Sequence, residues 1–126
     1  MTRFTFGRQE RLKSPTLISR LFKEGQVLMA YPLRVVWLQL PEQTDAGHGA
    51  PAQVVITVPK KHFKTAVSRN LMKRRIREAY RLQKSDLYEK LGTRRVALLL
   101  MFIAREELPF ADIEAGIGKM IKKWPG

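Results

Sequence analysis

Nine consecutive apolar residues, Val96 to Ala104 (VALLLMFIA), place the strongest limit on what this chain can fold into. A helix needs about 20 apolar residues to span a bilayer, so this run is too short to cross a membrane. Short continuous apolar runs are typical of buried strands, and we expect one here. Because residues 1–13 contain no apolar run of the signal-peptide kind, we also expect a soluble, cytoplasmic protein without a membrane partner.

Apolar periodicity and helix-boundary residues predict the other elements. Ser14 and Pro15 predict the start of a helix that ends at Gly25. Strands are expected at 27–30, 33–40 and 53–58, and helices at 68–84 and at about 109–124. Alternation divides the strand at 33–40 between two faces, with Leu33, Val35 and Trp37 on one and Arg34, Val36 and Leu38 on the other. The predicted element order is αβββαβα, an α+β fold.

The length and composition predict a single globular domain over residues 1–126. Apolar residues make up 44% of the chain and charged residues 28%, as is usual for globular proteins. The chain has no cysteine, which excludes disulfides, thiolate metal sites and a cysteine nucleophile. His48, His62 and the adjacent acids Glu106 and Glu107 show no metal-ligand or catalytic-triad spacing. We therefore expect no catalytic residue, no metal ligand and no cofactor bound by the protein.

Positive charge is concentrated in residues 60–84, KKHFKTAVSRNLMKRRIREAYRLQK. This segment holds ten Lys or Arg and one acid, Glu78, for a net charge of +9 (10 − 1). The whole chain has 24 basic and 11 acidic residues and a net charge of +13, so the remainder contributes only +4 (14 − 10). Such a concentration of charge is unfavourable without a neutralising anion. The closely spaced phosphates of nucleic acid fit this requirement best.

The basic residues gather on one face of the helix expected at 68–84. That face contains Arg69, Asn70, Lys73, Arg74, Arg77, Arg81 and Lys84, and it is preceded by Lys60, Lys61 and Lys64. Tyr80 is expected at its edge, and Glu78 is expected to point away from it. Every fourth residue from Arg69 to Arg81 is basic, a repulsive pattern that disfavours a merely solvated face. A membrane-surface or calmodulin-target helix is disfavoured because the apolar side has no Trp or Phe anchor.

Two segments resemble the bacterial ribonuclease P protein component. The first runs from Arg11 to Leu28, opens with RLK and contains Gly25. The second, Lys60 to Arg81, fits KKxxKxAVxRNxxKRxIREAYR, which is highly specific to that family. The resemblance covers nearly the whole chain in the same element order. One departure is that the family's usual Arg-Asn-Arg triplet is here Arg69-Asn70-Leu71, so the charge of the third arginine is missing.

The resemblance implies a two-layer fold in which helices pack on a four-stranded sheet, with a left-handed βαβ crossover, as in ribosomal protein S5 domain 2. It implies an accessory subunit of an endoribonuclease that removes the 5′ leader from precursor tRNA, with catalysis by an RNA and its magnesium. The partners would be ribonuclease P RNA and precursor tRNA, and no DNA is expected. The basic residues from Lys60 to Arg81 would dock on the catalytic RNA. A groove between the first helix and the sheet would hold the single-stranded leader, lined by Ile18, Phe22, Arg34 and Val36.

Three alternatives stay open. Ile18 and Phe22 share one stripe of the first helix, and on sequence alone such a stripe belongs to a core more often than to a surface that stacks bases. The chain could be a general RNA-binding or ribosomal protein with no role in tRNA processing. It could also be a self-sufficient nuclease, but that would require a carboxylate or histidine cluster that the sequence does not show.

Overall fold

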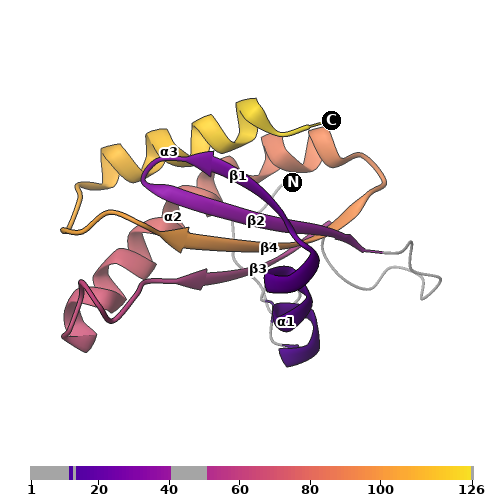
Figure 1. Ribbon diagram of the computed structural model, residues 1–126. Coiled ribbons are helices and arrows are strands. Elements are labelled where there is room, and N and C mark those ends of the chain that lie inside the picture. The colour runs from indigo at the N-terminus through magenta and orange to yellow at the C-terminus, as the bar shows by residue number, and fades with distance from the viewer. Residues whose placement is uncertain (1–11, 13, 41–50, 126) are drawn as a thin grey trace.

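The computed structural model describes Leu12 and residues 14–40 and 51–125. Figure 1 labels its elements. In chain order they are α1 (Pro15–Glu24), β1 (Gln26–Ala30), β2 (Leu33–Leu40), β3 (Ala52–Thr57), α2 (Ala66–Leu91), β4 (Arg95–Phe102) and α3 (Phe110–Lys123). The predicted order αβββαβα is confirmed. Within the described ranges, no helix is long and apolar enough to cross a membrane.

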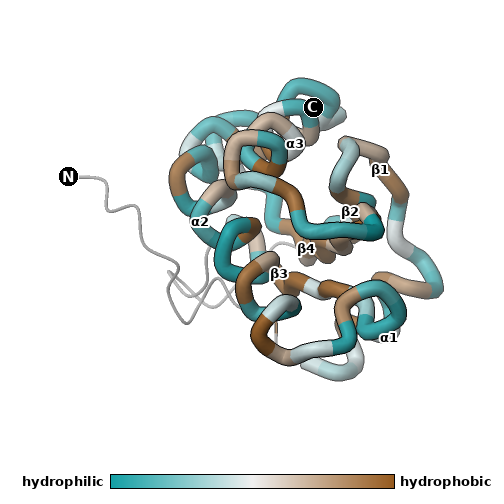
Figure 2. The backbone as a smooth tube through the Cα atoms, turned by 90° about the vertical axis from the view of Figure 1, so that its left-hand side faces the viewer, coloured by the Kyte–Doolittle hydropathy of each residue, from teal (hydrophilic) through white to brown (hydrophobic). Residues whose placement is uncertain are grey.

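The strands form one mixed sheet in the order β1-β2-β4-β3. β2 pairs antiparallel with both β1 and β4, whereas β3 runs parallel to β4. The parallel pair is connected through α2, which lies behind the sheet in Figure 1 and on its left in Figure 2. This β3–α2–β4 crossover is left-handed, as the resemblance implied, although about 98% of such connections in proteins are right-handed.

The main core lies between the sheet and the pair of helices α2 and α3. The central strand β4 contributes Leu98, Leu100 and Phe102, all fully buried, so the buried strand expected at the apolar run is confirmed. Trp37 of β2 meets Trp124, just after α3, with ring centroids 5.0 Å apart. These contacts hold α3 and the sheet together.

The single helix α1 covers part of the opposite face of the sheet, as Figure 2 shows. It starts at Ser14, whose hydroxyl accepts a hydrogen bond from the Leu17 N–H at 3.3 Å, and ends at Gly25, as predicted. Leu21 packs on this face in a second, smaller core with Val36 and Leu99. The sheet is therefore covered by α2 and α3 on one side and only partly covered, by α1, on the other.

Helix α2 continues to Leu91, beyond the predicted end near Lys84. Leu87 and Leu91 extend the buried stripe of the helix at helical spacing, and Gly92 ends it with a φ of 61°. The extra turns were missed because Asp86 and other polar residues separate these two leucines from the apolar residues before them.

Candidate RNA interfaces

Exposed basic side chains form a band that leads into α2 and continues along its outer surface. We call it the basic band; its members are Lys60, Lys61, Lys64, Asn70, Arg74 and Arg77, all exposed. Thr65 caps the helix between the two halves of the band, because its hydroxyl accepts a hydrogen bond from the Ser68 N–H at 3.2 Å. The band presents five cations and one amide to solvent.

Arg69 and Lys73, which were also predicted to bind RNA, are half-buried. The Arg69 guanidinium donates a hydrogen bond to the Phe63 carbonyl at 2.7 Å. Phe63 is buried, and its ring centroid lies 5.6 Å from that of Phe102 in the main core. Arg69 thus ties the segment before α2 to the core, a structural role that the charge pattern did not indicate.

The buried side of α2 is rotated toward the basic face relative to the helical-wheel expectation. Tyr80, expected at the edge of the basic face, is fully buried, and Lys84, expected within that face, is only 6% exposed. Leu82, expected on the apolar side, is exposed. Helix α3 packs against α2, where the Gln83 side chain donates to the Glu114 carbonyl at 3.0 Å, and the main core joins Tyr80 to residues of both α3 and the sheet, so tertiary packing decides which side of α2 is buried.

Arg81 is paired with Glu78, whereas Glu78 was expected to point away from the basic face. The Arg81 Nε donates a hydrogen bond to the Glu78 carboxylate at 2.9 Å. This hydrogen bond lowers the pKa of Glu78 and raises the pKa of Arg81, and the attraction between the two charges acts in the same direction. A phosphate that binds Arg81 must therefore compete with Glu78.

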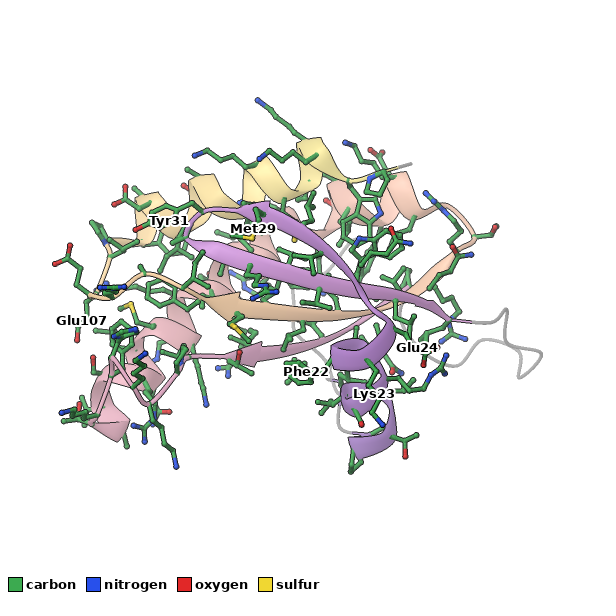
Figure 3. The ribbon with its side chains drawn as sticks, in the orientation of Figure 1. Phe22, Lys23, Glu24, Met29, Tyr31 and Glu107 are labelled. Atoms are coloured by element: carbon green, nitrogen blue, oxygen red, sulfur yellow. The ribbon has the colours of Figure 1, made fainter. Side chains whose placement is uncertain are left out.

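A second set of exposed side chains lies on the sheet face that α1 only partly covers. Phe22 on α1 is 62% exposed and Met29 on β1 is 47% exposed; Figure 3 labels both. Arg34 on β2 is also exposed, and Ile18 is half-buried against the small core. Phe22 is therefore a surface residue, and the alternative that places it in a core is wrong.

Val36 does not line this surface, contrary to the prediction. It is only 6% exposed, because it belongs to the small core under α1 together with Leu21. Alternation correctly placed Val36 on the same side of β2 as Arg34. It could not indicate that the end of α1 covers Val36 and leaves Arg34 open.

The neighbours of Arg34 were not predicted. Strand register sets Met29, Arg34, Met101 and Thr57 side by side across β1, β2, β4 and β3, and we call these four residues the open row. Met101 and Thr57 are half-buried. The Thr57 hydroxyl is buried and has no hydrogen-bond partner in the described part of the chain. The row depends on which strands pair, and no residue pattern within a single strand carries that information.

The chemistry offered by both surfaces is that of binding. The basic band supplies cations for phosphates, and Phe22 and Met29 each supply exposed apolar surface on which a base can rest. His62 is exposed beside the band, and His48 lies outside the described residues. No three His, Cys, Asp or Glu side chains gather into a potential metal site in the part of the chain that the structure describes.

Comparisons with known proteins agree with each other. A family model described as Ribonuclease P matches residues 6–124. The ribonuclease P protein component of Porphyromonas gingivalis is 36% identical over 126 aligned residues, covering 97% of this chain and 89% of the relative. That of Chlorobaculum tepidum is 33% identical over 106 residues, covering 79% and 68%.

Solved structures share the fold. The RNase P protein from Thermotoga maritima superposes with a TM-score of 0.70 at 21% identity, covering 93% of this chain and 99% of that one. The RNase P protein of Staphylococcus aureus gives a TM-score of 0.67 at 21% identity, covering 90% and 93%.

Proposed function

The chain belongs to the ribonuclease P protein component family, and we propose that it binds the catalytic RNA through the basic band and the 5′ leader of precursor tRNA beside α1. Membership makes it the accessory protein subunit of an endoribonuclease that matures the 5′ ends of tRNA, with ribonuclease P RNA as its partner. We also propose that catalysis belongs to the RNA and its magnesium and that the protein works in the cytoplasm.

The observation that carries the RNA-binding part is the basic band. Its five cations are exposed, and none of them forms an ion pair with a described residue. Cations without an ion-pair partner can contribute most to RNA affinity, because their binding to phosphates releases the counterions condensed on the RNA. Arg69 supports the band indirectly by fixing the segment that carries Lys60, Lys61 and Lys64.

The leader-binding part rests on Phe22. An aromatic side chain with most of its surface in water loses hydrophobic stabilisation unless something covers it. Single-stranded RNA is commonly recognised by stacking of its bases on aromatic side chains. Exposed Met29 and Arg34 lie on the same side of the sheet and widen the surface that a leader could contact.

Reconstitution tests this function against its two alternatives. Purified protein is mixed with ribonuclease P RNA and a precursor tRNA at a magnesium concentration too low for the RNA to act alone. We expect cleavage only when protein and RNA are both present. Cleavage by the protein alone would indicate a self-sufficient nuclease. No stimulation of the RNA would leave a general RNA-binding protein.

Phe22→Ala should reduce the preference of the assembled holoenzyme for precursor over mature tRNA. Loss of one base stacked on an aromatic residue costs about 1–3 kcal/mol, so the ratio of the two affinities should fall by roughly 5- to 150-fold. Only the precursor carries a leader, so binding of mature tRNA should not change. Stability should change little, because Phe22 is exposed.

Leu82→Ala is the matched control, because it shortens another exposed apolar side chain on the outer surface of α2. It should leave the precursor preference intact. Equal losses for precursor and mature tRNA in Phe22→Ala would contradict a leader contact at this residue.

A further inference from the structure

Arg34 stands at the centre of the open row, between two methionines. Register places Met29 of β1 opposite Arg34 on one side and Met101 of β4 opposite it on the other. Neighbouring strands lie about 4.8 Å apart, so both thioethers lie beside the Arg34 side chain. Arg34 is exposed, and its side chain forms no hydrogen bond or ion pair with any residue that the structure describes.

The acid at the end of α1 does not neutralise Arg34. Glu24 pairs with Arg20 at 3.0 Å. Figure 3 shows Lys23 and Glu24 on the side of α1 away from Phe22. The Arg34 guanidinium is thus an unpaired donor group next to apolar side chains, open to a ligand.

We propose that Arg34 selects guanine at one position of the leader. The inference rests on the proposed function, because it assumes that the leader lies on this face. Arginine carries five N–H donors in a planar fork and no acceptor. Guanine presents two adjacent acceptors, O6 and N7, that match the fork. On the corresponding edge adenine and cytosine present an amino donor, and uracil presents only one acceptor.

The surroundings of Arg34 favour a base over a phosphate as its partner. Met29 and Met101, which flank Arg34, offer apolar surface, which stabilises a base and gives nothing to a phosphate. A base that rests on either methionine would have its edge next to Arg34, whose fork can donate two hydrogen bonds. The same guanidinium would bind a phosphate through charge alone, without distinguishing nucleotides.

The test compares precursor tRNAs that differ in one leader nucleotide, cleaved in competition by the reconstituted holoenzyme. Each leader position is varied in turn through all four nucleotides. We expect one position at which guanine raises kcat/KM by roughly tenfold over the others. Arg34→Met should remove this preference. Arg34→Lys should remove it too, because lysine keeps the charge but lacks the fork.

Lys23→Gln is the matched control, since it removes an exposed cation from α1 and should preserve the guanine preference. The inference is wrong if no position prefers guanine. It is also wrong if Arg34→Met lowers kcat/KM equally for all four nucleotides while Arg34→Lys restores it, which is the behaviour of a phosphate contact. If either result is found while Phe22→Ala still loses the preference for precursor tRNA, only the role of Arg34 is overturned. If Phe22→Ala instead keeps the wild-type preference for precursor tRNA, the proposed leader site itself is contradicted.

Discussion

Replacing Arg74 and Arg77 together by alanine should weaken binding to ribonuclease P RNA about 25- to 60-fold near 0.1 M salt. Each phosphate contact contributes about 0.7–0.9 to the slope of log K against log salt, so losing two should reduce the slope by about 1.4–1.8. The wild-type slope should be near −4 to −5 if the five cations of the basic band and half-buried Lys73 neutralise about six phosphates. Both side chains are exposed on α2, and alanine is the better helix former, so a circular-dichroism melt should be unchanged.

A variant with Lys119→Ala and Lys122→Ala provides the control. It removes the same charge from exposed positions on α3, outside the basic band, and should keep the wild-type slope. A wild-type slope shallower than about −2 would mean that the basic band is not the main RNA-binding surface. An unfolded Arg74/Arg77 variant would mean that these side chains stabilise the protein instead.

Local patterns were sufficient to predict the elements of this fold. Ser14 and Gly25 bound α1 because a cap and a helix stop act within one turn of chain. The apolar run beginning at Val96 predicted a buried strand for a similarly local reason. Strand order and crossover handedness depend on contacts between distant segments. The left-handed crossover was predicted only from the family resemblance, because the general rule predicts a right-handed one.

The candidate site was predicted less completely, and α2 shows why. The helical wheel assigned the exposed face of α2 from the positions of its basic residues, whereas the elements that pack against the helix decide which face is buried. Lys84 illustrates the difference, because it is only 6% exposed although the wheel placed it in solvent. A long aliphatic stem makes such burial tolerable for lysine. The exposed members of the basic band, such as Arg74, lie on the side of α2 turned away from the core.

The surface beside α1 depends on how closely that helix approaches the sheet, and Gly25 sets this distance. A Cβ added at Gly25 would lie 2.4 Å from the Leu21 carbonyl oxygen and 2.5 Å from the Val36 Cγ1. Its backbone angles are ordinary, with φ at −66°, so glycine is required here for space and not for conformation. The close approach seats Leu21 in the small core and leaves Phe22 in solvent.

Gly25→Ala should therefore lower the free energy of unfolding by about 2–3 kcal/mol, because overpacking a contact of this kind forces backbone movement. The melting temperature should fall by roughly 10 °C. Gly118→Ala is the control: its added Cβ would lie 3.3 Å from the Gln83 Oε1, the far end of a flexible side chain, and alanine favours the helix. It should melt at or slightly above the wild-type temperature.

Since α1 carries Phe22, Gly25→Ala should also lose precursor preference in the assembled holoenzyme. A variant that melts lower yet keeps that preference would show that the leader does not depend on where α1 sits.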